Sequence, residues 1–517
     1  MTNKSVLMVA SENDAHPGAK VGGVGDVIRD LPANLKNHGL DVSTIIPSYG
    51  FLSRIEGIES LAFIDVPFMG HQYRVQLLRS SDPSNAATHY VLHHALFSIH
   101  GETVYCHDGD DRPFAKDATK FAFFCAAIAH GMVQEHIPKP DVIHCHDWHS
   151  AFLLILIRYS PQFELLTQIK TVFSIHNMAM QGVRPFSGDE SSFEKWFPDL
   201  AYYPSEICDP LYRDCVNPIR AAIRFASVVH TVSPSYAREI LQRSDHAAGI
   251  YGGENLQDEL AARANDKQLI GILNGCEYPK KKIVKPSKSS FIAQADKDLC
   301  QWASASSIMS SAHWLAEKRI ASFGKSKKTA FVVSSVGRLT EQKARLLLVD
   351  LGSGKTALDQ LLLTLGDRGQ LILIGSGDKN LEAAVIKVAG RHTNCIFLNG
   401  YSAKLADMLY AYGDLFLMPS SFEPCGISQL LAMRSAQPCL VHAVGGLKDT
   451  VKNNDNGFSF EASGLEAQAR AMVNLFSELL TMKENSPEIW EGIVNKARKT
   501  RFSWDTVAQS YLEQLYS

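Results

Sequence analysis

The stretch "PGAKVGGVGDVIRDLP" (Pro17–Pro32) follows a short apolar run, "VLMVA" (6–10), and precedes a second one, "VSTIIP" (42–47). Glycine crowds the turn after the first run, and a turn of this kind commonly connects a strand to a helix. One lysine, Lys20, lies among these glycines. The stretch therefore predicts the first strand–turn–helix unit of a parallel α/β sheet.

The same alternation of short β-branched runs and longer helical segments continues along the chain, which predicts two doubly wound α/β domains. Between the two halves, from about Glu277 to Thr329, a section rich in lysine and serine has no strand pattern and predicts a linker with a helical insertion. The further predicted strands are "DVIHCH" (141–146), "TVFSIH" (171–176) and "SVVHTVSP" (227–234) in the first half, then "FVVSSVG" (331–337), "LILIGSG" (371–377), "IFLNG" (396–400), "LFLMPS" (415–420) and "PCLVHA" (438–443).

Length, charge and cysteine content narrow the class of protein. A chain of 517 residues is too long for a single hydrophobic core. The net charge of -3, with both signs intermixed, argues against nucleic acid or an anionic membrane surface as a partner. Apolar runs such as "AFLLILI" (151–157) are too short for a bilayer and no leader pattern opens the chain, so we expect a cytoplasmic protein. The ten cysteines include no Cys-x-x-Cys pair, which favours reduced thiols.

The glycines beside Lys20 remove side chains at the start of the predicted helix. Backbone N–H groups and the helix dipole favour an anion there, and Lys20 adds a full positive charge. The spacing differs from the dinucleotide fingerprint G-x-G-x-x-G, because Ile28 stands where its last glycine is required. Two interpretations stay open: an anion-binding loop made with Gly22, Gly23 and Gly25, or a tight turn with a solvated lysine.

Polar residues follow two predicted strands of the first half. Ligands of doubly wound domains bind beyond the carboxyl ends of the strands, so these positions are candidates. "HCHDWH" ends one strand with Asp147, and "SIHNMAMQG" ends another with His176 and Asn177. Two such strand ends in one half favour a shared ligand site over isolated structural histidines.

The cluster in "HCHDWH" also invites a metal interpretation. His144 and His146 share one strand face, whereas Asp147 lies past the end of the strand. No glutamate completes a hydrolase pattern. We therefore expect no metal.

In the second half, "GRLTEQKA" (337–344) places Arg338 and Lys343 at the start of a helix that follows a strand. Two cations there suit a diphosphate, and the alternative is a pair of ordinary surface charges. The nearby "GSGKT" (352–356) is not a phosphate loop, because Val349 stands where its first glycine is required.

A carboxylate and a second glycine turn follow further along. "LMPSSFEPCGISQLLAM" (417–433) places Glu423 in a turn between a strand and a helix. In "VGGLKDTV" (444–451), Gly445 and Gly446 predict a turn with exposed backbone N–H groups. A carboxylate facing such a turn suits a ligand with a sugar and a phosphate.

Together these segments resemble the glycogen and starch synthases of bacteria and plants. Members of that family are retaining glucosyltransferases of GT-B architecture that use a nucleotide-diphosphate glucose. The resemblance extends over nearly the whole chain. The matching segments are, in order, "KVGGVGDV", "HDWHSAF", "SIHNMAMQG", "TVSPSYAREI", "GILNG", "GRLTEQK", "IGSGD", "MPSSFEPCG", "GGLKDTV" and "FSWDTVAQSYLEQLY".

The resemblance implies an ADP-glucose or UDP-glucose donor, a glycogen or maltooligosaccharide acceptor, no cofactor, and cations that neutralise the departing diphosphate in place of a metal. It leaves the oligomeric state open. The implied catalytic residues are Lys20, Asp147, His176, Arg338, Lys343 and Glu423. The implied substrate-binding residues are Gly22, Gly23, Asp26, Asn177, Cys425, Gly426, Gly445, Gly446 and Leu447.

The same resemblance implies two Rossmann-like domains facing a deep interdomain cleft. Residues 1–272 would form the acceptor side and residues 273–498 the donor side. Residues 499–517 would form a helix that crosses back to the first domain. The apolar face expected for that helix consists of Phe502, Trp504, Tyr511 and Leu515.

Some positions depart from the family pattern. Ser421 replaces arginine before F-E-P-C-G, Val444 replaces threonine before G-G-L, and Arg220 replaces lysine in "NPIR". "NGCEYP" replaces N-G-I-D, and the Y-D-x-W-x-P pattern is missing. Two alternatives to an α-1,4-glucan synthase therefore stay open: a retaining glucosyltransferase with a smaller acceptor, and a non-catalytic paralogue that binds glucan or nucleotide sugar.

Overall fold

The computed structural model describes residues 4–80, 87–106, 108–109, 112–305, 310–326 and 331–517. The chain divides into two compact units, each with its own sheet. The first consists of Met1–Ser244, Gly252–Gly275 and Ser503–Ser517, and the second of Asp245–Tyr251 and Cys276–Phe502.

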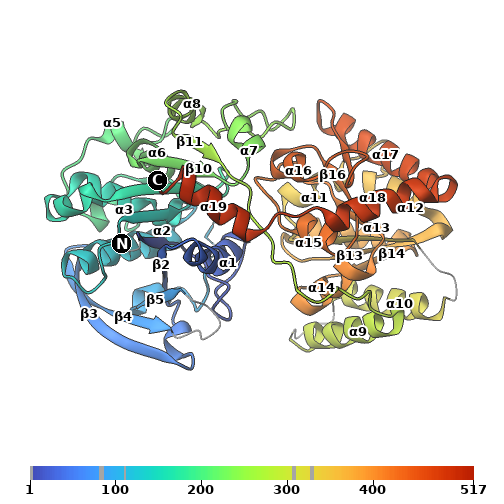
Figure 1. Cartoon of the computed structure of the whole chain (residues 1–517), viewed down its shortest axis with the longest axis horizontal. Helices are drawn as coiled ribbons and strands as arrows, with labels where there is room; N and C mark the ends of the chain where they lie inside the picture. Colours follow the sequence, from blue (N-terminus) through green and yellow to red (C-terminus); the bar gives the residue numbers. More distant parts are fainter. Residues whose placement is uncertain (1–3, 81–86, 107, 110–111, 306–309, 327–330) are drawn as a thin grey trace. The chain divides into compact units, whose positions relative to one another are not determined.

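The first unit contains a nine-stranded sheet in the order β11-β10-β7-β6-β1-β2-β5-β4-β3 (Figure 1). Its strands are β1 (Ser5–Val9), β2 (Asp41–Pro47), β3 (Ile58–Phe68), β4 (His71–Ser80), β5 (Thr88–His93), β6 (Val142–His146), β7 (Lys170–Ile175), β10 (Val228–Thr231) and β11 (Leu269–Gly271). The helices are α1 (Gly23–Asn37), α2 (Ala115–Val133), α3 (Trp148–Tyr159), α4 (Phe193–Trp196), α5 (Pro204–Ile207), α6 (Pro218–Phe225), α7 (Pro234–Glu239), α8 (Gln257–Asn265) and α19 (Trp504–Gln514). A small pair, β8 (Arg184–Pro185) and β9 (Cys215–Val216), forms a separate antiparallel sheet.

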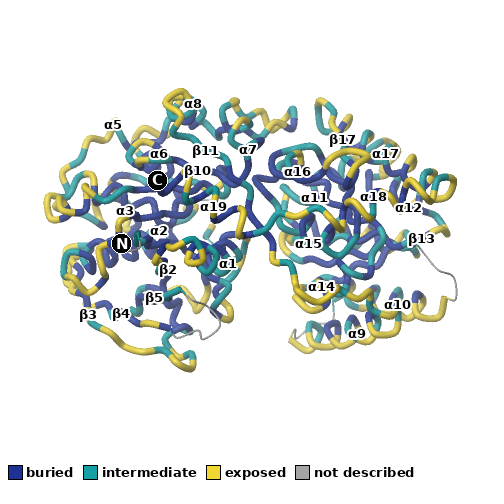
Figure 2. The backbone as a smooth tube through the Cα atoms, in the orientation of Figure 1, coloured by how far each residue is buried: buried dark blue, intermediate teal, exposed yellow. Residues whose placement is uncertain are grey.

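The edge of this sheet differs from the all-parallel prediction. β4 is antiparallel to both β3 and β5, and a two-residue turn, Met69–Gly70, joins β3 to β4. Both turn residues have positive φ, which suits a tight hairpin. Figure 2 shows exposed residues along β3 and β4, so these strands lack the continuous apolar runs of the central strands. The search for apolar runs therefore did not identify β3 and β4 as strands.

The terminal helix α19 packs on the first unit, as the resemblance implied. It lies beside α1 in Figure 1, and Trp504, Tyr511 and Leu515 are buried in the same core as the central strands. The indole Nε1 of Trp504 donates to Oδ2 of Asp30 at 3.0 Å. Phe502 differs from its prediction: it precedes the helix and packs against the core of the second unit.

The second unit contains a six-stranded parallel sheet in the order β14-β13-β12-β15-β16-β17. The strands are β12 (Phe331–Val336), β13 (Gly369–Ile374), β14 (Cys395–Leu398), β15 (Leu415–Met418), β16 (Cys439–His442) and β17 (Phe458–Phe460). The helices are α9 (Lys288–Ser304), α10 (Ser311–Lys325), α11 (Glu341–Leu348), α12 (Ala357–Leu365), α13 (Lys379–Arg391), α14 (Ala403–Tyr412), α15 (Ser428–Arg434), α16 (Gly445–Thr450), α17 (Leu465–Asn485) and α18 (Pro487–Lys499).

Alternate residues of each central strand enter two separate cores. In β13, Leu371 and Leu373 join one core while Ile372 and Ile374 join the other. Both faces of this sheet are therefore covered by helices, which explains its continuous apolar strand sequences.

The section predicted as a linker and helical insertion contains the helices α9 and α10 among its described residues, and both helices contribute to the second core. Phe291 of α9 and Ile320 of α10 are buried in the core that contains Ile372. Burial of these apolar positions therefore makes the two helices part of the second unit. Throughout the described residues, no helix combines the length and the apolar character needed to cross a membrane.

Candidate active site

The central strands place the candidate residues of the first unit. β1 has β2 on one side and β6 on the other, so the strand order reverses there. Ligands of doubly wound sheets bind beyond the carboxyl ends of the strands at such a reversal. The loop after β1 carries Lys20 and the loop after β6 carries Asp147. His176 and Asn177 follow the neighbouring strand β7.

Lys20 is half-buried and paired with carboxylates. Its Nζ lies 3.0 Å from Oδ2 of Asp14 and 2.6 Å from Oδ1 of Asp26. Burial opposes the charge, but the two carboxylates outweigh it and raise the pKa of Lys20. Lys20 is therefore a fixed cation and not the solvated lysine of the alternative interpretation.

The glycine loop already holds an internal anion, which corrects the expectation of free N–H groups. Glu12 is only 2% exposed. Its Oε2 accepts hydrogen bonds from the backbone N–H groups of Val21 (2.7 Å) and Gly22 (2.5 Å). Its Oε1 accepts one from the hydroxyl of Tyr105 at 2.7 Å. Two N–H groups of the loop are thus used to fix its shape.

Sequence reasoning missed Glu12. It follows β1 by three positions, so the strand-end criterion that selected Asp147 also applied to it. A Cβ on Gly25 would lie 3.4 Å from Oε2 of Glu12 and 3.1 Å from Cγ of Lys20. Glycine at position 25 therefore lets Glu12 and Lys20 pack against the start of α1.

Asp147 occupies the position just before α3 in an uncommon backbone conformation. Its φ of 56° is rare outside glycine, and such conformations collect at functional sites. Its Oδ1 accepts a hydrogen bond of 2.7 Å from the backbone N–H of His176. Burial raises the pKa of Asp147 to about 7, and the charge of Glu12 adds to the rise. Backbone hydrogen bonds from His176 and Asn177 lower the pKa but do not outweigh burial. The carboxyl group can therefore exchange a proton near neutral pH.

The histidines form hydrogen bonds to one another and to other side chains. Nε2 of His176 lies 3.0 Å from Nδ1 of His146. His144 contacts the hydroxyl of Tyr516 through Nδ1 (2.7 Å) and that of Ser174 through Nε2 (2.6 Å). Burial lowers the pKa of His176 to about 4, so its ring is neutral at pH 7. Because Nε2 contacts His146, the neutral ring would meet a sugar hydroxyl through Nδ1, as donor or acceptor according to its tautomer.

Asn177 supports the turn that follows His176. Its Oδ1 accepts a hydrogen bond of 3.0 Å from the backbone N–H of Ala179. Among the residues that the structure describes, no three His, Cys, Asp or Glu side chains are grouped to hold a metal ion.

In the second unit, too, the candidate residues follow strands at a reversal of the strand order. β12 lies between β13 and β15, so the strand order reverses there too. Arg338 follows β12 and is exposed, and Lys343 lies in the first turn of α11. The loop after β15 carries Glu423, which is 6% exposed. Neighbouring strands therefore bring these residues to one edge of the sheet.

Lys343 and Glu423 contact each other directly. Nζ of Lys343 forms an ion pair with Oε2 of Glu423, which also accepts a 2.9 Å hydrogen bond from the Ser420 hydroxyl. Nε2 of Gln342 donates to the carbonyl of Phe422 at 3.0 Å. These contacts fix the loop of Glu423 against α11.

Gly445 and Gly446 do not form the exposed turn that the sequence predicted. Both are buried at the start of α16, and the N–H of Gly446 donates to the carbonyl of Glu423 at 3.0 Å. A Cβ on Gly446 would lie 2.3 Å from the carbonyl oxygen of Cys425. Close packing against the loop of Glu423 therefore explains the glycine at 446.

The other residues predicted to bind substrate in this unit lie around the same loop. Cys425 and Leu447 are buried. Gly426 has a φ of 78°, a conformation that favours glycine. These three residues shape the loop around Glu423.

Comparison with known proteins identifies the family of this chain. The family model for the starch synthase catalytic domain matches residues 5–261, and the model for glycosyl transferases group 1 matches residues 317–489. The glycogen synthase of Aeromonas salmonicida (strain A449) is 31% identical over 541 residues, covering 99% of this chain and 97% of that protein. The chain belongs to the glycogen and starch synthase family. The glycogen synthase of Desulfitobacterium hafniense (strain DSM 10664 / DCB-2) is 29% identical, with 97% of this chain and 98% of that protein covered.

Solved structures show the same GT-B fold. The catalytic domain of starch synthase IV from Arabidopsis thaliana, bound to ADP and acarbose, matches with a TM-score of 0.74 and 24% identity, covering 99% of each chain. Sucrose-phosphate synthase from Thermosynechococcus elongatus matches with a TM-score of 0.56 and 15% identity, covering 99% of this chain and 98% of that one. The chain is thus a glycosyltransferase built from two α/β units.

Two departures from the family pattern are buried in this glycosyltransferase. Arg220 donates to the Cys208 carbonyl at 2.7 Å and forms an ion pair of 2.6 Å with Glu259. Ser421 is buried, and its backbone N–H donates to the carbonyl of Gln342 at 2.8 Å. Both residues therefore serve the packing of their own unit.

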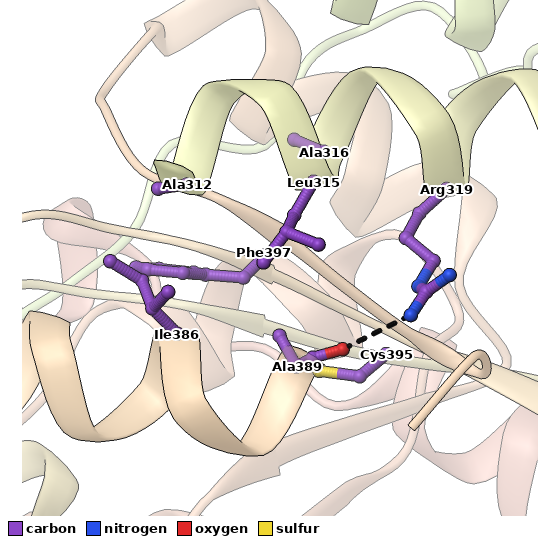
Figure 3. Close-up of a pocket in the computed structure, with 8 residues that line it drawn as sticks. All are labelled: Ala312, Leu315, Ala316, Arg319, Ile386, Ala389, Cys395 and Phe397. Atoms are coloured by element: carbon purple, nitrogen blue, oxygen red, sulfur yellow. Dashed lines mark hydrogen bonds between the residues drawn. The ribbon is translucent and has the colours of Figure 1, made fainter. Parts of the chain in front are cut away.

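The hollow in Figure 3 is separate from the candidate residues. It lies between α10, α13 and β14, where Nη2 of Arg319 donates to the Ala389 carbonyl at 3.4 Å. Its lining is largely apolar, and it has no room for a water molecule. It is a packing gap in the core.

Proposed function

We propose that this glycosyltransferase is a glycogen synthase. It transfers glucose from ADP-glucose or UDP-glucose to the non-reducing end of an α-1,4-glucan, with retention of configuration. The observation that carries the proposal is the ion pair of Lys343 with the buried Glu423 at the strand-order reversal of the second sheet. The names of the full-length relatives support the choice of reaction.

The cations account for the departure of the nucleotide diphosphate. We assign Arg338 and Lys343 to the diphosphate and Lys20 to its distal phosphate. Fixed positive charges of this kind stabilise the negative charge that grows on the leaving group. The protein's own cations then do this work, and no cofactor is required by the proposal.

Polar side chains account for the transferred glucose. Glu423 is held by Lys343 and Ser420, so its carboxylate is oriented before any sugar binds. The neutral ring of His176 and the carboxyl group of Asp147 offer donors and acceptors for hydroxyl groups. In a retaining transfer, the acceptor hydroxyl arrives on the face that the diphosphate leaves. We assign these groups to the sugar that carries the oxocarbenium-like charge. Asp26 and Asn177 support them.

The assignment of the chain's parts follows from these roles. We propose residues 1–272 as the acceptor side and residues 273–498 as the donor side. The returning helix, expected within residues 499–517, is α19 (Trp504–Gln514). A cytoplasmic location stays a prediction.

A transfer assay tests the proposal. Labelled ADP-glucose or UDP-glucose is incubated with glycogen, maltooligosaccharides or a small sugar, and the label in each product is measured. We expect the label to appear in glycogen, and we expect NMR to show that the new linkage is α. Glu423→Gln should abolish transfer, whereas Glu466→Gln, on the exposed surface of α17, should not.

Other outcomes point to the alternatives. Transfer to small sugars alone would favour a glucosyltransferase with a smaller acceptor. Binding of ADP-glucose with no transfer to any acceptor would favour a non-catalytic paralogue, for which the changes at Ser421, Val444 and Arg220 are the supporting observation.

A further inference from the structure

Lys20 belongs to a compact charged cluster. Two cations, Lys20 and Arg29, contact three carboxylates, those of Asp14, Asp26 and Asp30. The carboxylates outnumber the cations by one. An anionic leaving group placed beside Lys20 would therefore meet negative charge as well as positive charge.

Arg29 shares both carboxylates that hold Lys20. Nη1 of Arg29 contacts Oδ2 of Asp14, the atom that Lys20 also contacts. Nη2 of Arg29 lies 3.3 Å from Oδ1 of Asp26, again the atom that Lys20 contacts. The side chains of Asp14 and Asp26 are 26% and 15% exposed, so solvent compensates their charge only in part.

The head group of Arg29 is fixed from its other side. Nε and Nη2 donate to the two oxygens of Asp30 at 2.5 and 2.8 Å. Oδ2 of Asp30 in turn accepts the hydrogen bond from Trp504 of the terminal helix. A two-point contact of this kind holds a guanidinium in one orientation, which an ammonium cannot reproduce.

We propose that Arg29 is a positioning residue for glucosyl transfer, because it compensates Asp14 and Asp26 and so keeps the charge of Lys20 available to the leaving phosphate. The inference rests on the proposed function. Without Arg29, the two carboxylates would bind Lys20 alone and repel the departing diphosphate. The effect should fall mainly on turnover, since the charge of the leaving group grows in the transition state.

The test is a set of kinetic measurements with labelled ADP-glucose and glycogen. Arg29→Ala should lower kcat by about 5- to 30-fold, less than the loss of a direct charge-assisted contact to the phosphate because Arg29 acts through Lys20, with a smaller change in KM. Arg29→Lys should recover part of the loss because it restores the charge. Arg29→Ala combined with Asp14→Asn should recover most of it, because the carboxylates again outnumber the cations by one, as in the wild type. Arg79→Ala, which breaks an exposed ion pair with Glu59, is the matched control.

Two results would overturn the proposal. One is an Arg29→Ala enzyme with unchanged kcat. The other is a double variant no more active than Arg29→Ala, since a purely structural bridge is not repaired by removing its second partner. Melting temperatures of all variants separate unfolding from lost turnover.

A wild-type protein that transfers nothing would contradict the proposed function instead. Calorimetric titration with ADP then tests the inference: Arg29→Ala should bind ADP more weakly, and Asp14→Asn should restore the affinity. Equal affinities would overturn it.

Discussion

Nζ of Lys343 forms an ion pair with Oε2 of Glu423, a residue 80 positions further along the chain. The two residues follow β12 and β15, which are neighbours in the sheet although two strands separate them in sequence. In the resting enzyme the predicted phosphate-binding lysine therefore also orients the predicted sugar-binding glutamate.

The diphosphate contacts are the first prediction. Arg338→Ala or Lys343→Ala should lower kcat/KM by roughly 10- to 100-fold, or about 1.5–3 kcal/mol, because each removes a charge-assisted contact. Steady-state kinetics over a range of ADP-glucose concentrations measures the effect. Arg368→Ala removes an exposed guanidinium of the same unit and serves as the control. Unchanged kinetics in both variants would contradict the assignment of Arg338 and Lys343 to the diphosphate.

The second prediction concerns Lys20. Lys20→Ala should lower kcat by about 10²–10³-fold, beyond any loss of donor affinity, because the lysine acts most strongly in the transition state. Lys20→Arg should rescue only part of the activity, since the wider guanidinium must fit between Asp14 and Asp26. A thermal melt checks that the fold is intact. A near-normal kcat for Lys20→Ala would contradict the proposed role of Lys20 at the leaving group. The tight turn alone would then explain the neighbouring glycines.

Metal removal is the third test. The proposed cations neutralise the leaving group, so transfer should continue after dialysis against EDTA. The rate before and after dialysis, and after Mg²⁺ or Mn²⁺ is added back, is the measurement. A complete loss of transfer activity that added metal restores would contradict the prediction. It would favour a metal site at His144, His146 and Asp147.

The fourth prediction concerns the terminal helix. Truncation after Lys499 removes Trp504, Tyr511 and Tyr516 from the first core, so the shortened protein should unfold at a much lower temperature. A milder variant, Tyr516→Phe, removes the hydrogen bond to the buried His144 and should cost about 1–3 kcal/mol in urea unfolding. A truncated enzyme with full stability and activity would show that the packing of α19 is dispensable.

The fifth prediction follows from the raised pKa of Asp147. A carboxyl group with a pKa of about 7 in the folded state, against about 3.9 in the unfolded chain, binds its proton more tightly when folded. Its contribution to stability is therefore present at acidic pH and is lost as the pH rises through about 7. Between pH 4 and pH 8, the free energy of unfolding of Asp147→Asn should rise relative to that of the wild type. Urea titrations at several pH values measure this difference.

The control for this pH dependence is Asp199→Asn, which changes an exposed carboxylate of the same unit. Its stability should run parallel to that of the wild type at all pH values. Parallel curves for Asp147→Asn as well would mean that Asp147 is ionised in the folded protein across this range.

Sequence patterns identified the central strands and the residues that follow them. The run "LILI" (371–374) indicates a buried strand because both faces of its sheet are covered, so every residue of the run is apolar. The strands β3 and β4 escaped the same criterion because one face of the hairpin is exposed and carries polar side chains.

Local sequence placed Lys20, Asp147, Arg338 and Glu423 at the ends of strands, since a strand and its following turn involve neighbours in the chain. It contained no information about which carboxylates would hold Lys20, or that Glu12 would take the N–H groups of Val21 and Gly22. Those contacts depend on side-chain distances of a few ångströms. The partnership of Lys343 with Glu423 likewise required β15 to pair with β12, and strand order is settled by packing between distant segments.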